Sequence, residues 1–142
     1  VITDLVCALV ECGLLPEQIG VVSPYRAQGR EIRNRLRRLL PDRQAQRAIV
    51  VDTVERMQGQ ERDVILVSLA TSSIYFAERL AEFFFQPQRL NVAVTRPRKK
   101  LVIVGSSHVL SATPREPELQ AAVGMLRDLL GSCAYRKVAY RI

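Results

Sequence analysis

The chain has no apolar run long enough to cross a membrane. Its longest apolar stretches, such as Val64 to Ala70, have the length of a β-strand, whereas a transmembrane helix needs roughly 20 residues. Residues 1–13 include apolar positions, but Asp4 and Glu11 interrupt them and no basic segment precedes them, which argues against a secretory signal. We therefore expect a cytoplasmic protein with no membrane partner.

Cysteine and histidine are scarce. Cys7 and Cys12 lie near one end, Cys133 lies near the other, and His108 has no cysteine close to it in sequence. No zinc-binding spacing is present, so we expect no metal site. An odd number of cysteines fits reduced thiols in a reducing compartment.

The chain also lacks an initiator methionine, because it begins at Val1 and its two methionines are Met57 and Met125. We therefore interpret it as a fragment of a longer protein. Its 142 residues have the usual length of one domain, and 48% hydrophobic with 25% charged residues is a globular balance. The net charge of +7 suggests a polyanionic partner, because neutralised phosphates release counterions, but charge alone does not identify one.

Short apolar runs alternate with helical patterns along the chain. The runs are rich in valine and isoleucine, as in parallel strands covered on both faces, and occupy residues 19–22, 48–51, 64–69 and 101–104. Helical spacing occurs at residues 2–10, 26–40, 90–95 and 116–130, and residues 138–142 alternate like a last strand. This order predicts an α/β domain with a mainly parallel sheet and helices on both faces, without fixing the spatial order of the strands.

The helix expected at residues 26–40 has an apolar stripe and a cationic face. The stripe consists of Ile32, Leu36, Leu39 and Leu40, and the cationic face consists of Arg30, Arg33 and Arg37. Pro41 ends the helix, and we expect a short loop at 41–47. The arginines either contact phosphates or remain solvated.

Three polar segments adjoin strand ends, where open parallel sheets place their ligands. The first, residues 21–28 (VVSPYRAQ), joins a strand to a helix whose N-terminus can offer N–H groups to a phosphate, although an ordinary capped turn reads the same way.

The second polar segment, residues 51–63, reads VDTVERMQGQERD. Thr53 can donate its hydroxyl to a phosphate oxygen, and Gly59 permits close backbone approach. Glu61 would repel a bare triphosphate, so we expect it to meet a ribose hydroxyl, a metal-held water or an arginine. A solvated loop is the alternative.

The third polar segment, residues 88–100, reads QRLNVAVTRPRKK. Arginine suits a transferring phosphoryl group, because it stays charged and its fork matches phosphate oxygens. The alternative is that these cations complement the helix dipole and stay solvated. Between the second and third segments, the aromatic residues of 71–88 could stack bases or could form ordinary core.

In order and spacing, the SPYRAQ, VDTVERMQGQERD and RLNVAVTRPR stretches resemble motifs IV, V and VI of superfamily 1 helicases. The branch that contains the nonsense-mediated-decay helicase and the Okazaki-fragment nuclease-helicase is the most similar. The resemblance covers roughly residues 19–107. It implies a three-layer RecA-like domain, the second of two motor domains, and 5′ to 3′ movement on single-stranded nucleic acid.

The resemblance also implies a nucleotide-facing group. Arg96 matches the motif VI arginine that reaches the γ-phosphate held by the first RecA-like domain. Glu61 matches a residue that contacts the nucleotide, while Gln58 and Gly59 shape the same loop. Arg98 is a further nucleotide-binding candidate.

A second group would contact the nucleic acid. Thr53 matches a motif V residue that touches the nucleic-acid backbone, and Tyr25 and Gln28 match motif IV. The cationic helix face adds Arg30 and Arg33 as candidates. One departure is visible at Pro97, where the family often has alanine. This proline ends the helix earlier and shifts Arg98 relative to Arg96.

No phosphate-binding Gly-x-x-x-x-Gly-Lys-Ser/Thr loop and no acidic pair after a strand are found in the sequence. ATP and Mg²⁺ would then be held mainly by a first motor domain that precedes Val1, and this chain alone would be inactive. The rival interpretations are a passive basic nucleic-acid-binding module and a small-molecule enzyme on a doubly wound fold, but no dinucleotide loop or catalytic dyad supports the latter. The sequence does not distinguish DNA from RNA.

Overall fold

The computed structural model describes residues 1–69, 86–111, 113 and 115–134. Within these residues, four strands form one sheet in the order β2-β1-β3-β4, and every neighbouring pair is parallel. The strands are β1 (Ile19–Val22), β2 (Val50–Asp52), β3 (Arg62–Ser68) and β4 (Pro97–Val104). The predicted parallel sheet is confirmed.

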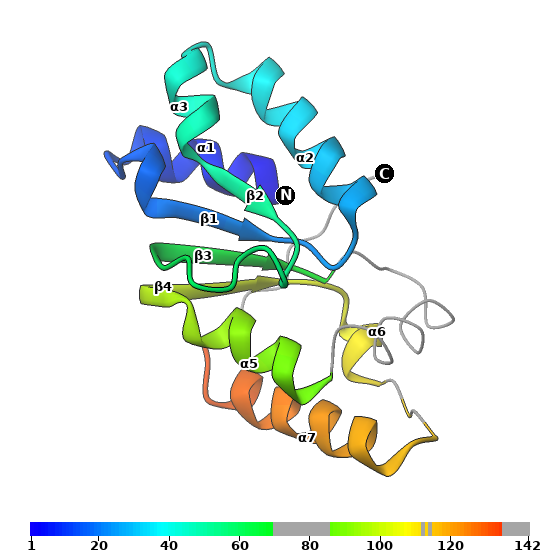
Figure 1. Cartoon of the computed structure of the whole chain (residues 1–142). Helices are drawn as coiled ribbons and strands as arrows, with labels where there is room; N and C mark the ends of the chain where they lie inside the picture. The colour runs from blue at the N-terminus through cyan, green and yellow to red at the C-terminus, as the bar shows by residue number, and fades with distance from the viewer. Residues whose placement is uncertain (70–85, 112, 114, 135–142) are drawn as a thin grey trace.

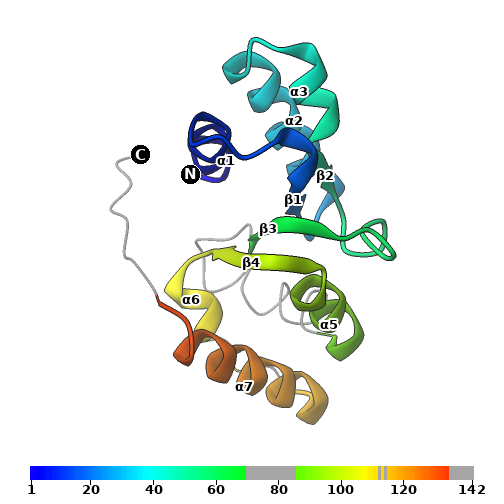
Figure 2. The ribbon, with the colours of Figure 1, turned by 90° about the vertical axis from the view of Figure 1, so that its left-hand side faces the viewer.

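Helices cover both faces of this sheet (Figures 1 and 2). On one face lie α1 (Ile2–Glu11), α2 (Arg26–Leu39) and α3 (Arg43–Ala48); on the other lie α5 (Pro87–Thr95), α6 (Ser107–Leu110) and α7 (Pro117–Gly131). A short 3-10 helix, η1 (Pro16–Gln18), leads into β1. The chain is therefore a three-layer α/β domain of the RecA-like kind.

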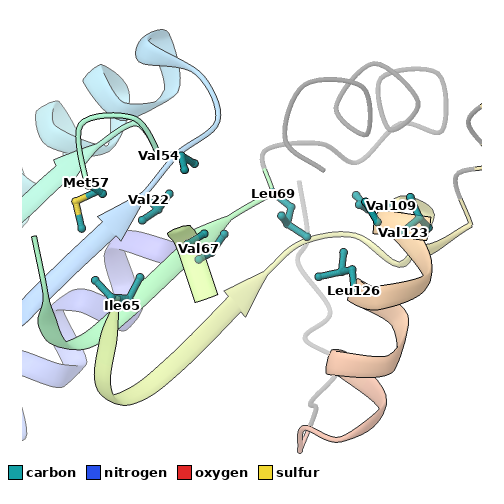
Figure 3. Close-up of a cluster of buried hydrophobic side chains, with 11 residues drawn as sticks. Val22, Val54, Met57, Ile65, Val67, Leu69, Val109, Val123 and Leu126 are labelled. Carbon is teal, nitrogen blue, oxygen red and sulfur yellow. The ribbon is translucent and has the colours of Figure 1, made fainter. Parts of the chain in front are cut away.

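Alternate residues of the strands feed two separate hydrophobic clusters, because successive strand side chains point to opposite faces. Val21 and Leu66 belong to the cluster beneath α1 and α2. Ile65 and Val67 belong to the other cluster, which Leu126 of α7 closes (Figure 3). Burial of these apolar surfaces is the main favourable contribution to folding.

Most of the expected helices are confirmed, and their ends have clear causes. Gly13 adopts a φ of +92° just after α1, and the N–H groups of Gly13 and Leu14 donate to the carbonyls of Val10 and Leu9. This is the pattern of a Schellman cap, which favours glycine. In α2 the predicted stripe is partly wrong, because Leu39 is 46% exposed.

The loop expected at residues 41–47 is wrong, because residues 43–48 form α3. The Asp42 side chain caps this helix by accepting a hydrogen bond from the Gln44 N–H at 2.8 Å. Of its six residues only Ala45 is buried, so no apolar periodicity marks the helix in the sequence. The strand expected at 48–51 consequently begins two residues later, at Val50.

Two predictions lie outside the described residues: the last strand at 138–142 and the aromatic residues between 71 and 85. In the described part of the chain, no helix is long and apolar enough to span a membrane.

The connection from β2 to β3 determines where the polar segments lie. β2 ends where the parallel strands finish, whereas β3 begins at the other end of the strands. Residues 53–61 therefore run the full length of the strands and cross over β1. A Cβ on Gly20 of β1 would lie 2.6 Å from Ile65 Cδ1 and 3.1 Å from Met57 Cε. Glycine at position 20 thus lets this connection pack closely against the sheet.

Candidate functional site

The sheet has two polar edges, because all its strands run in the same direction. Residues 23–28 and Thr53 follow β1 and β2 at the edge where strands end, here called the carboxyl edge. Residues 58–61 and 96–98 lie where β3 and β4 begin, here called the amino edge. The seven residues of β3 separate the two edges by about 20 Å. The expectation that all three segments lie at ligand-binding carboxyl ends is therefore wrong.

Neutral side chains are hydrogen-bonded to one another at the carboxyl edge. The Ser23 hydroxyl lies 2.6 Å from Gln28 Oε1, and Gln28 Nε2 donates to Ser68 Oγ at 2.7 Å. Gln28 thereby joins the end of β1 to the end of β3. Tyr25, the first residue before α2, is 41% exposed at the same edge.

Thr53 lies beside this network, because the Ser23 N–H donates to the carbonyl of Asp52 at 3.0 Å. Thr53 is buried, and its side chain helps to stabilise the ionised carboxylate of Glu55. Burial opposes ionisation of Glu55, but its own backbone N–H, Thr53 and the charge of Arg89 outweigh burial and lower the pKa of Glu55. Arg89 of α5 forms an ion pair with Glu55 at 2.9 Å.

Charged side chains dominate the amino edge. Glu61 Oε2 lies 3.2 Å from Arg98 Nε, so of the three partners expected for Glu61 it meets an arginine. The pairing of β3 with β4 shifts register between Arg62 and Val64. Such bulges re-aim side chains, and this one places Arg98 beside Glu61.

Asp63, the second residue of β3, is almost fully buried and is contacted from two sides. Lys99 Nζ lies 2.8 Å from Asp63 Oδ2, and Gln18 Nε2 donates to the same oxygen at 2.7 Å. The hydrogen bond from Lys99 is the main reason that the pKa of Asp63 is lowered, while burial opposes the shift. This cluster connects η1, β3 and β4.

Arg96 lies between α5 and β4 at this edge. The carbonyl of Arg96 accepts the N–H of Arg62 at 3.3 Å, and Pro97 opens β4 directly opposite Arg62. The helix does end at Thr95, as expected from Pro97. The Nε atoms of Arg96 and Arg62 are buried, and neither has a hydrogen-bond partner among the described residues.

Gln58 and Gly59 are exposed in the turn before Glu61. Gly59 has a φ of +77°, and no atom lies within 4 Å of the position that a Cβ would take. Glycine is therefore required at position 59 for its backbone conformation, and the space above it is open to a ligand. In the described part of the chain, no three metal-ligating side chains of His, Cys, Asp or Glu converge.

Two members of the predicted cationic face of α2 are held by hydrogen bonds. Arg33 Nη1 donates to the carbonyl of Val51 at 2.5 Å, and Arg37 Nη1 donates to Asn34 Oδ1 at 3.2 Å. Arg30 is exposed.

Sequence reasoning missed Ser68, Asp63 and Lys99. A signal for Asp63 exists, because a carboxylate directly before the apolar run of β3 needs a partner once buried. Ser68 has no such signal, since a serine at the end of a strand is common in any fold.

Comparisons with known proteins show which family the chain resembles. A family model described as an AAA domain matches residues 1–108. The chain is 43% identical over 97 residues to DNA polymerase alpha-associated DNA helicase A of Saccharomyces cerevisiae, covering 68% of this chain and 13% of that protein.

Two further relatives carry different names. The chain is 39% identical over 114 residues to the Regulator of nonsense transcripts 1 homolog of Arabidopsis thaliana, covering 80% of this chain and 9% of the relative. It is 35% identical over 102 residues to a DNA replication ATP-dependent helicase/nuclease of Xenopus tropicalis, covering 72% and 9%. The chain thus spans about a tenth of the length of these relatives. It belongs to the superfamily 1 helicases, in the branch that contains the regulators of nonsense transcripts and the DNA replication helicase/nucleases.

Proposed function

We propose that the chain is the second RecA-like motor domain of an ATP-dependent DNA or RNA helicase. Its amino edge supplies an arginine finger to a nucleotide bound by a first motor domain, and its carboxyl edge forms part of the single-strand track. These relatives are several times longer than this chain, because the matched residues make up only 13% and 9% of their lengths, and this leaves room for the first domain.

The buried Nε of Arg96, without a hydrogen-bond partner in the described structure, is the observation that carries this proposal. A buried donor left unpaired costs stability, on the order of 1–3 kcal/mol, unless something else accepts its hydrogen bond. A phosphate oxygen brought by a partner domain would do so, because a guanidinium fits phosphate oxygens with two parallel hydrogen bonds.

The neighbouring residues suit an anion at this place. Arg98 is neutralised by Glu61, so it holds the loop after Gly59 in position and leaves Arg96 as the cation directed at the phosphate. Bound ATP with Mg²⁺ supplies the γ-phosphoryl group whose transfer to water drives such motors. Both would be held mainly by the first domain, because this chain has no phosphate-binding loop.

At the carboxyl edge, Tyr25 and Thr53 are the proposed contacts to the strand. The Thr53 side chain already favours the ionised carboxylate of Glu55, so a phosphate would compete with that carboxylate for it. Arg89 would then retain Glu55, since the two are in an ion pair at 2.9 Å. Gln28 is occupied by Ser23 and Ser68, and we propose that it holds this edge in shape beneath the strand.

The test is steady-state ATP hydrolysis by the full-length helicase that contains this domain, with Arg96→Ala compared with Arg115→Ala. Arg115 is an exposed arginine before α7, so its loss controls for charge. We expect Arg96→Ala to lower turnover by roughly 10³ to 10⁵ with little change in nucleotide affinity, because a finger acts on transition-state charge.

A variant that kept more than about a tenth of wild-type turnover would refute the finger, since that loss is only about 1.4 kcal/mol. Turnover that is untouched while strand binding falls would favour the passive nucleic-acid-binding module. Arg96→Lys tests the geometry, because it keeps the charge and loses the fork.

A further inference from the structure

A groove of about 690 Å³ lies along the outer edge of β2, between α2 and α3. These three elements lie together at the edge of the sheet farthest from α7 (Figure 1). Four arginines line the groove: Arg33 and Arg37 from α2, and Arg43 and Arg47 from α3. Among the described residues that line it, Asp52 is the acidic one.

Both helices direct their arginines into the groove because of their spacing. Residues four apart lie on the same face of a helix, so Arg33 pairs with Arg37 and Arg43 pairs with Arg47. Like charges so arranged repel each other, on the order of a few tenths of a kcal/mol per pair. An arrangement that gathers four of them is unfavourable unless an anion compensates.

No such compensation comes from the described residues. None of the four arginines forms an ion pair with a described carboxylate, whereas their near neighbours Arg35 and Arg38 pair with Asp4 and Glu31. The one acidic lining residue, Asp52, has Arg56 at 3.7 Å. The groove is therefore a concentrated positive site facing solvent.

The hydrogen bonding of β2, which forms one wall of the groove, distinguishes between the anions that could bind there. An acidic peptide could add as a further strand to the side of β2 that pairs with no described strand. However, the carbonyl of Val51 already accepts a hydrogen bond from Arg33. The same contact fixes the Arg33 guanidinium on the wall and blocks strand addition at the middle of β2.

We infer that this groove binds the phosphodiester backbone of a nucleic-acid strand where the strand continues beyond the carboxyl edge. The groove reaches Asp52, the residue directly before Thr53, so it is continuous with the proposed track. This inference rests on the proposed function and adds to it Arg43 and Arg47, on a helix that the sequence did not predict.

The test measures binding of a fluorescein-labelled oligothymidylate to the 142-residue chain by anisotropy over a range of salt. Arg43→Ala/Arg47→Ala removes two groove charges, and both side chains are exposed, so the fold should persist. The control Arg115→Ala/Arg127→Ala removes the same charge at exposed positions by α7. Arg43→Lys/Arg47→Lys restores charge without the fork.

We expect the groove variant to flatten the log–log salt slope by about 1.4, or about 0.7 for each lost phosphate contact on a single strand. The ratio of wild-type to variant affinity should then fall about sevenfold between 50 and 200 mM salt. The lysine variant should recover the slope, and the control should match wild type.

Equal slopes for the groove variant and its charge control would overturn the inference. So would a groove variant that loses binding to labelled polyglutamate while keeping its oligothymidylate slope, because an acidic protein segment would then be the occupant. Neither result bears on Arg96 turnover, so failure here is distinguishable from failure of the proposed motor role.

Discussion

The amino and carboxyl edges of the sheet differ in the side chains that they carry. At the amino edge, charges face each other in close pairs: Glu61 with Arg98 and Asp63 with Lys99. At the carboxyl edge, Ser23, Gln28 and Ser68 form a network of neutral groups. In the proposed function, the amino edge acts on transition-state charge and the carboxyl edge contacts the strand.

Residues 53–61 cross β1 and connect the two edges, and the side chain of Met57 packs this connection against the sheet. Met57 is fully buried, whereas Met125 on α7 is 59% exposed. We expect Met57→Ala to destabilise the chain by about 2–5 kcal/mol, because it leaves a cavity under the connection. Urea unfolding with Met125→Ala as the matched control measures this, and a Met57 variant within about 0.5 kcal/mol of that control would show that the edges are not joined there.

The ion pairs of the amino edge should make its stability sensitive to acid. The hydrogen bond from Lys99 lowers the pKa of Asp63, so this contribution is fully present above the ordinary aspartate pKa of about 3.9 and is lost as pH falls below it. We expect the gap in unfolding free energy between wild type and Asp63→Asn to shrink from about pH 5 to pH 3.

Asp128→Asn, on an exposed face of α7, controls for the loss of one carboxylate in the same titration. A gap that stays constant over this range would mean that the pairing of Asp63 with Lys99 and Gln18 does not persist in solution. No matching acid sensitivity is expected from the Ser23, Gln28 and Ser68 network, because none of these groups titrates there.

Much of the fold could be predicted, because apolar runs and helical stripes are local signals. β1, β3 and α2 follow from them directly, and Gly13 and Pro97 mark the ends of their helices. The short helix α3 could not be predicted, since a single buried residue gives no periodicity.

The division of the site into two edges could not be read from the motifs alone. Thr53 and Glu61 are eight positions apart in one polar segment, yet the crossover places them at opposite ends of the strands. The sequence predicted a loop for Arg43 and Arg47, whereas in the structure they lie on α3 and line the same groove as Arg33 and Arg37. Such groupings depend on strand order and register, which local patterns do not encode.

The central claim is that the two edges have separate tasks, and one titration tests it most directly. ATP hydrolysis by the full-length helicase would be measured against single-strand concentration for wild type, Arg96→Ala and Thr53→Ala. The account predicts that Arg96→Ala lowers maximal turnover by roughly 10³ or more at an unchanged half-saturating strand concentration. Thr53→Ala should raise that concentration, on the order of tenfold for the loss of a hydrogen bond to a charged group, and leave maximal turnover intact. Two variants that changed the same parameter to a similar extent would contradict the account.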